Sequence, residues 1–269
     1  MGRTIVVGID GSEQAGAALR WAAAQAERDG AVLSLLHGWE ARASSSEARI
    51  ASAAAALVDQ TVAAVASDHP GLVVKGESVR RAPAAALIDA SGAADLVVVG
   101  SRGHGGFAGL LLGSVGQQCI HHARSPVAVV RESDGEVHGR VVVGVDGSRS
   151  SLLALEWAVD EAERRRAAVR VVCAWHYPPV GAFVIGPDEG YDGLASQVVE
   201  EASAPYRERV TIELEERFGP AAGVLLEAAE RADLLVVGSR GHGGFRELLL
   251  GSTGSECAHH ARCPVVVVR

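Results

Sequence analysis

The chain has 269 residues, of which 48% are hydrophobic, and a formal net charge of −8; it is long enough for two ordinary domains with buried cores. The acidic balance argues against a nucleic-acid partner, whose phosphates favour a basic protein face. Its four cysteines lack CxxC or Cys/His metal spacing, which indicates reduced thiols in a cytoplasmic protein.

The first half of the chain alternates between short apolar runs and longer Ala-rich stretches. We predict strands at 4–9, 31–39, 72–79, 96–100 and 126–130, and helices at 13–29, 46–67, 84–92 and 114–123. Such alternation indicates βαβ crossovers and a parallel sheet covered on both faces. The N-terminal apolar run is a strand and not a signal peptide. No apolar run approaches the ~20 residues of a membrane helix, so we expect no membrane partner.

The chain repeats itself. Residues 96–131 and 234–269 are identical at 27 of 36 positions, and IVVGIDGS at 5–12 matches VVVGVDGS at 141–148. A period of this length makes each copy a domain. We therefore assign residues 1–131 to the first domain, 132–139 to a polar linker and 140–269 to the second domain.

The second copy differs from the first in its middle. An extra loop at 176–193, with Tyr177, Phe183 and Tyr191, follows its second strand. This loop is either a lid over a ligand or an interface between subunits. The strand at 72–79 has no evident counterpart in the second copy. Because a sheet tolerates the loss of an edge strand better than of a central one, we expect the missing strand to be at an edge.

Spaced glycines follow the strand at 96–100. Gly100 and Gly103 precede Gly113 and Ser114, where the next helix begins, and the second copy repeats the pattern at Gly238, Gly241, Gly251 and Ser252. Glycine permits φ > 0 and close approach of a ligand, and the amides of a helix N-terminus favour an anion. The pattern predicts a phosphate site; the alternative is plain turns followed by an N-cap.

Charged residues flank these glycines. Asp10 and Asp146 end the first strand of each copy, in DGS. Each is either an Asx turn before a helix cap or a carboxylate near a ribose or a phosphate-bound metal. Arg102 and Arg240 lie inside the glycine loops, where they either reach a phosphate or are solvated. If the first and fourth strands are neighbours, Asp10 and Gly100 face one crevice at the carboxyl ends of the strands.

The G-x2-G-x9-G-S spacing, the VVGxDGS start and the closing PVxVV strand resemble the universal stress protein family in its tandem two-domain form, across essentially the whole chain. The resemblance implies two Rossmann-like domains of the adenine nucleotide alpha hydrolase-like type. It also implies a parallel five-stranded sheet in the order 3-2-1-4-5, with strand 3 missing from the second copy. The glycine motif marks the family's ATP-binding branch, so the implied ligand is ATP, with Mg²⁺ as a possible companion.

Site residues are implied by position. In the first copy, the adenine side is formed by Ile9, Gly38 and Val99, with Asp10 near the ribose or a metal. The phosphates lie on Gly100, Gly103, Gly113, Ser114 and Val115. The matching residues of the second copy are Val145, Ala174, Val237, Asp146, Gly238, Gly241, Gly251, Ser252 and Thr253. Gly38 and Ala174 are smaller than the apolar residue expected there.

The resemblance also implies pairing through the last strands, which gives an intramolecular pseudo-dimer and a homodimer. We expect a nucleotide-dependent stress-response regulator or sensor. The alternatives are a slow ATP-hydrolysing enzyme on the same fold, without a dedicated general base, and a dimerisation scaffold that binds no nucleotide. The sequence has no HxGH, SGGxDS or GxxxxGK[ST] motif, and its only lysine is Lys75, which argues against nucleotidyl transferases and P-loop NTPases.

Overall fold

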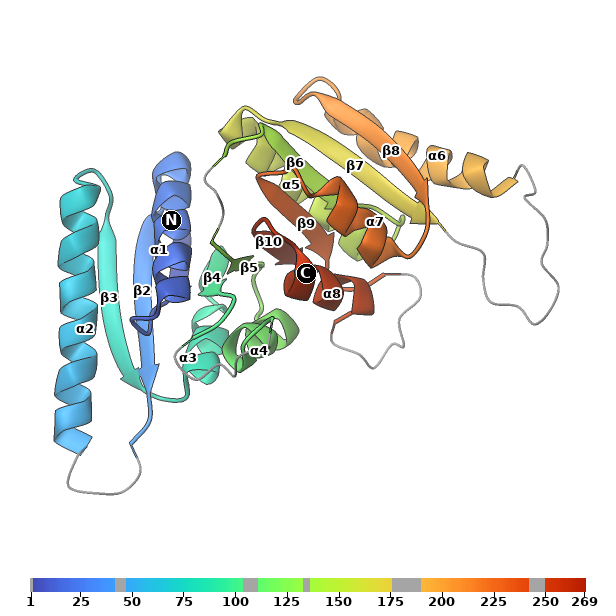
Figure 1. The fold of residues 1–269 in the computed structure, drawn as a ribbon. Coiled ribbons are helices and arrows are strands. Elements are labelled where there is room, and N and C mark those ends of the chain that lie inside the picture. The colour runs from blue at the N-terminus through green and yellow to red at the C-terminus, as the bar shows by residue number, and fades with distance from the viewer. Residues whose placement is uncertain (1, 42–46, 104–110, 133–135, 176–189, 242–249) are drawn as a thin grey trace, which may run out of the picture. The chain divides into compact units, whose positions relative to one another are not determined.

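The computed structural model describes residues 2–41, 47–103, 111–132, 136–175, 190–241 and 250–269. The chain forms two compact units, residues 1–133 and 134–269, each an α/β unit (Figure 1). This agrees with the duplication in the sequence.

In the first unit, strands and helices alternate as expected. Its described elements are β1 (Thr4–Gly8), α1 (Glu13–Asp29), β2 (Val32–Trp39), α2 (Glu47–Asp68), β3 (Val74–Arg80), α3 (Pro83–Ala90), β4 (Leu96–Gly100), α4 (Ser114–His122) and β5 (Val127–Val130). β4 and β5 are almost entirely buried, as strands covered on both faces should be.

The sheet of the first unit is parallel throughout its described pairs. β1 pairs with both β2 and β4, β2 pairs with β3, and β4 pairs with β5. The resulting order is β3-β2-β1-β4-β5, which is the order that the family resemblance implies. The predicted α/β class with a parallel sheet is confirmed. Right-handed crossovers place α1 and α2 on one face and α3 and α4 on the other.

The second unit repeats this arrangement. Its described elements are β6 (Arg140–Gly144), α5 (Arg149–Arg165), β7 (Ala168–Trp175), α6 (Gly190–Ser203), a short 3₁₀ helix η1 (Ala204–Tyr206), β8 (Ile212–Phe218), α7 (Ala221–Ala228), β9 (Leu234–Gly238), α8 (Ser252–His260) and β10 (Val265–Val268). Its parallel pairs give the order β8-β7-β6-β9-β10. Residues 176–189 of the extra loop, which the sequence leaves open as a lid or an interface, lie outside the described residues.

The prediction that the second copy lacks its third strand is wrong, because β8 pairs along β7 as the edge strand. Its sequence, IELEERF, is rich in glutamate, which is depleted in strands, so it lacks the apolar pattern that indicated the other strands. Arg170 on β7 lies 3.0 Å from a Glu213 oxygen and 3.2 Å from a Glu215 oxygen. Burial opposes ionisation of Glu213, but hydrogen bonds from Arg170 and Arg140 outweigh it and lower the pKa of Glu213. Cross-strand ion pairs thus stabilise a strand that propensity disfavours.

A second correction concerns α2. The expectation that no apolar run reaches membrane length is wrong, because this 22-residue helix has a mean hydropathy of 1.4 over its most apolar window, of which only 17% is buried. Length and composition alone would let it cross a membrane. In the structure it packs on β3, where a Cβ on Gly76 would lie 2.4 Å from Val58 and 2.6 Å from Val62. Gly76 therefore permits close contact between helix and strand.

Candidate functional site

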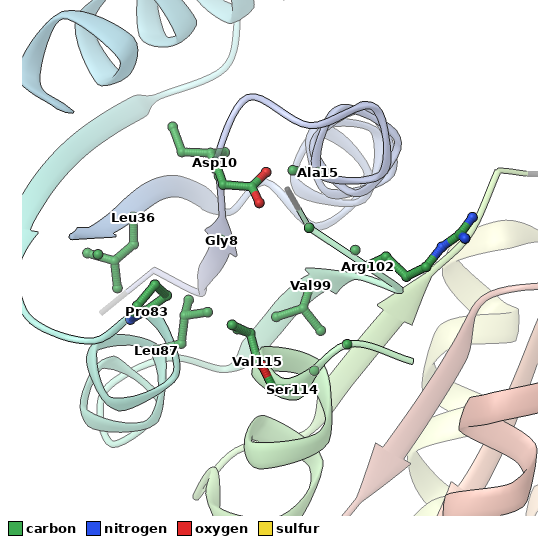
Figure 2. Close-up of a pocket in the computed structure, with 16 residues that line it drawn as sticks. Gly8, Asp10, Ala15, Leu36, Pro83, Leu87, Val99, Arg102, Ser114 and Val115 are labelled. Carbon is green, nitrogen blue, oxygen red and sulfur yellow. The ribbon is translucent and has the colours of Figure 1, made fainter. Parts of the chain in front are cut away.

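A cavity of about 570 Å³ opens at the carboxyl ends of β1 and β4 (Figure 2). β1 lies between β2 and β4, so the chain leaves this point in opposite directions along the sheet. Such switch points are where open α/β sheets bind ligands, and the volume is typical of small-molecule sites.

All ten residues that the sequence placed at the first site line this one cavity. They are Ile9, Asp10, Gly38, Val99, Gly100, Arg102, Gly103, Gly113, Ser114 and Val115. Six further lining residues were not predicted: Gly8, Ala15, Leu36, Pro83, Leu87 and Gly116. The cavity therefore extends from the glycine motif across to α3.

The cavity has an apolar end. Ile9, Leu36, Leu87 and Val99 are each less than 10% exposed, and Figure 2 shows Leu36, Leu87 and Pro83 grouped on the side away from Arg102. The backbone N–H of Ile9 donates to the Leu36 carbonyl at 3.0 Å, which extends the β1–β2 ladder by one residue. A flat apolar ring would find its contacts here.

Gly38 lies at this end because α3 begins directly against it. A Cβ on Gly38 would lie 2.7 Å from the Cα of Pro83 and 2.9 Å from the Arg81 carbonyl oxygen, so a larger residue would displace the α3 N-terminus. Pro83 occupies the first position of α3, where its fixed φ is favourable. The apolar wall that Gly38 cannot supply is thus supplied by Pro83 and Leu87. A partial signal for this wall is present in the sequence, since Pro83 and Leu87 are one helical turn apart.

The glycines of the motif are needed for close approach. A Cβ on Gly100 would lie 2.7 Å from the Gln14 carbonyl oxygen, and one on Gly103 would lie 2.5 Å from Oδ2 of Asp10. Both distances are shorter than van der Waals contact. These two glycines therefore let the loop after β4 lie against the start of α1 and the Asp10 carboxylate.

Asp10 forms the predicted Asx turn. Its Oδ1 accepts a hydrogen bond from the Ser12 backbone N–H at 2.9 Å and another from the Ser12 hydroxyl at 2.6 Å. Ser12 in turn caps α1 by accepting from the Ala15 N–H at 3.2 Å. The structural reading of DGS therefore holds, and the same carboxylate also lines the cavity.

The start of α4 is different from the start of α1. Its N-cap is Gly113, which has no side chain, and within the described part of the chain no side-chain hydrogen bond caps the helix. The Gly113 N–H donates to the Ser101 carbonyl at 2.7 Å, which brings the helix start next to the end of β4. Because the first-turn amides of a helix lack partners within the helix, Ser114, Val115 and Gly116 present donors and the positive end of the dipole to the cavity.

Two arginines border the glycine loop. Arg102 is exposed, and Figure 2 shows its guanidinium directed away from the apolar end of the cavity. Arg131, directly after β5, donates from Nη2 to the Leu111 carbonyl at 3.0 Å. Leu112, the next residue, is buried against Gly116. Arg131 therefore contacts the segment that leads into α4.

The second unit brings its predicted residues together in the same way. A Cβ on Gly241 would lie 2.5 Å from Oδ2 of Asp146, and one on Gly238 would lie 2.8 Å from the Ser150 carbonyl oxygen. Gly251 is the N-cap residue of α8 and has no side chain with which to cap the helix. Its backbone N–H donates to the Ser239 carbonyl at 2.8 Å. The remaining predicted residues lie at the corresponding ends of β6, β7 and β9 and at the start of α8; they are Val145, Ala174, Val237, Arg240, Ser252 and Thr253.

No group of three or more His, Cys, Asp or Glu side chains suited to a metal ion occurs within the described parts of the chain. Asp10 and Asp146 therefore stand as single carboxylates beside the glycine loops. One carboxylate together with phosphate oxygens is a normal environment for Mg²⁺, so these residues fit a metal carried by a ligand better than a metal held by protein alone.

Fold and site together define a tandem duplicate of a Rossmann-like α/β unit, with a glycine-lined cavity at the switch point of its first sheet. The model of the universal stress protein family matches residues 1–131 and 138–269. The chain belongs to the universal stress protein family, in its tandem form.

Individual relatives agree with this assignment. A universal stress protein of Mycolicibacterium smegmatis is 36% identical over 284 residues, which cover 98% of this chain and 96% of the relative. One of Mycobacterium tuberculosis is 34% identical over 288 residues, with the same coverage. The crystal structure of a universal stress protein from Archaeoglobus fulgidus has a TM-score of 0.78 at 20% identity, covering 99% of this chain and 98% of that one. This last likeness supports the fold.

Proposed function

We propose that this protein binds ATP in both units and that ATP occupancy changes its conformation or its choice of partner in a cytoplasmic stress response. The observation that carries the proposal is the cavity at the β1–β4 switch point, which joins an apolar end to the uncapped start of α4. An adenine ring fits the apolar end, and a triphosphate fits the amides of Ser114, Val115 and Gly116.

The glycines support a phosphate chain in particular. Gly100 and Gly103 lie so close to Gln14 and Asp10 that any side chain would collide. Such a cradle accepts the phosphates on backbone amides, which suits a chain with a single lysine at position 75. Mg²⁺ on the phosphates would offset the repulsion between them and Asp10.

Binding is favoured over catalysis by the composition of the cavity. Among its described lining residues, Asp10 is the only acid, and there is no histidine, lysine or cysteine. The Asp10 carboxylate already accepts two hydrogen bonds from Ser12 at Oδ1, which commits that oxygen to the turn. Slow hydrolysis is the second candidate function, because a carboxylate and a metal beside the phosphates can position a water molecule.

We further propose that residues 132–139 link the two domains, that the last strands of the copies pair to form a pseudo-dimer, and that the protein forms homodimers. The acidic net charge supports a partner other than nucleic acid. A dimerisation scaffold without nucleotide is the remaining alternative.

One experiment separates these functions. First, the purified protein is denatured and the nucleotide released into the supernatant is identified by anion exchange. Native protein is then titrated with ATP, with and without Mg²⁺, while ADP release is followed. Two equivalents of bound ATP with little ADP support the proposal, and one equivalent limits binding to a single unit. Rapid ADP release supports the enzyme, and no binding at millimolar ATP supports the scaffold.

A further inference from the structure

The two glycine loops are held differently by the helices that lie against them. Gly100 and Gly238 contact the backbone of the second helical residue, Gln14 in α1 and Ser150 in α5. In the second unit, the Ser150 hydroxyl donates a hydrogen bond to the carbonyl of Arg240, inside the glycine loop. Among the described residues, Gln14 makes no corresponding bond to the first loop. The side chain at this position is therefore one difference between the described parts of the two sites.

The bond from Ser150 fixes the peptide between Arg240 and Gly241. A trans peptide is planar, with its C=O and N–H directed oppositely. A carbonyl held toward Ser150 therefore directs the Gly241 N–H away from α5. The nitrogen of Gly241 lies 3.8 Å from a Cβ built on Gly251, the N-cap of α8. The nitrogen of Gly103 lies at almost the same distance, 3.9 Å, from a Cβ built on Gly113. Both loops therefore place this donor beside the helix N-terminus, and among the described residues only the second unit has a serine that restrains it.

The next residue reinforces this arrangement. Ser151 is buried; its Oγ accepts from the Asp146 N–H at 3.2 Å and donates to the Ser148 carbonyl at 2.9 Å. The first unit has Ala15 at this position, where it lines the cavity. The turn that carries Asp146 is therefore tied to α5 by a side chain that the first unit lacks.

We infer that Ser150 is a positioning residue that orders the Arg240–Gly241 peptide before ligand arrives, so that the two ATP sites are not equivalent and the second binds more tightly. This inference rests on the proposed function, because it concerns the same sites. Ordering a loop in its bound conformation removes part of the entropic cost of binding. A single neutral hydrogen bond should change affinity about two- to tenfold.

The test blocks one ATP site at a time and changes the second helical residue, Ser150 or Gln14, at the other site. In protein whose first site is blocked by Gly103→Val, Ser150→Ala should weaken ATP binding two- to tenfold by calorimetry. In protein whose second site is blocked by Gly241→Val, Gln14→Ser should strengthen binding in the first unit. Ser67→Ala, at an exposed position of α2, is the matched control and should change neither affinity.

A second readout needs no nucleotide. By ¹⁵N relaxation of the ligand-free protein, the amide of Gly241 should have a higher order parameter than that of Gly103, and Ser150→Ala should remove the difference. Equal order parameters in the wild type, or an unchanged affinity after Ser150→Ala, overturn the inference while ATP binding stands. No ATP binding by the wild-type protein overturns the proposed function, and the relaxation result still decides whether Ser150 orders the loop.

Discussion

Gly103→Val is a substitution for which the structure predicts a large effect at the first site. A Cβ at this position would lie 2.5 Å from Oδ2 of Asp10, roughly 1 Å inside normal contact. The carboxylate or the loop must therefore move. Movement of Asp10 disturbs its two hydrogen bonds with Ser12, and movement of the loop withdraws amides from the phosphates.

The expected magnitude follows from these contacts. Losing about 3 kcal/mol of charge-assisted amide–phosphate hydrogen bonds corresponds to a loss of affinity on the order of 100-fold. Weakening the Asp10–Ser12 turn should lower the free energy of unfolding by about 1 kcal/mol. Calorimetric titration with ATP should therefore lose one of two binding sites, while circular dichroism still reports a folded chain.

Two controls accompany this experiment. In Gly241→Val, the added Cβ would lie 2.5 Å from Oδ2 of Asp146, so this variant should lose the ATP site of the second unit. Gly71→Val adds a side chain where a Cβ has no neighbour within 4 Å and should leave both sites unchanged. A folded Gly103→Val protein that binds ATP at both sites with wild-type affinity would refute the assignment of the loop.

Three further predictions concern the fold. Gly76→Ala, whose Cβ would lie 2.4 Å from Val58, should lower the free energy of unfolding by about 1–3 kcal/mol in urea titrations. The control Gly71→Ala should have little effect, and equal stabilities of the two variants would contradict the close contact of α2 with β3. Ser12→Ala removes the cap of α1 and should cost about 1 kcal/mol; a loss no greater than that for Ser67→Ala would argue against this cap. Burial raises the pKa of the Cys119 thiol from 9.0 to about 12. Because the unfolded chain therefore loses this proton first, the free energy of unfolding should fall as pH rises from 9 to 12. Cys119→Ala should reduce that fall by about 1.4 kcal/mol between about pH 8 and 10, and an identical pH profile for the variant and the wild type would refute this prediction.

Much of the fold could be predicted because the signals are local. The strands at β1, β4 and β5 are short Val-rich runs, and the helices between them are long and rich in alanine, so length and composition separate the two. β8 could not be recognised in this way, because its stability depends on Arg170 of the neighbouring strand. Ion pairs between strands are invisible until the pairing is known.

The site was predictable to the same extent. The glycines and Asp10 follow strand ends, and the switch-point rule brings such positions together once β1 and β4 are neighbours. Pro83 and Leu87 were missed because they belong to α3, whose position over Gly38 depends on tertiary packing. The small residue at position 38 was visible in the sequence, but its reason, the backbone of Pro83, was not.

The most direct measurement is a ¹H–¹⁵N correlation spectrum recorded as ATP is added. If the uncapped helix starts receive the triphosphate, the largest amide shifts should occur at Ser114, Val115 and Gly116 in α4 and at Ser252, Thr253 and Gly254 in α8, and adenosine without phosphates should not reproduce them. If these six amides stay unshifted at saturating ATP, the phosphates bind elsewhere and the central claim fails.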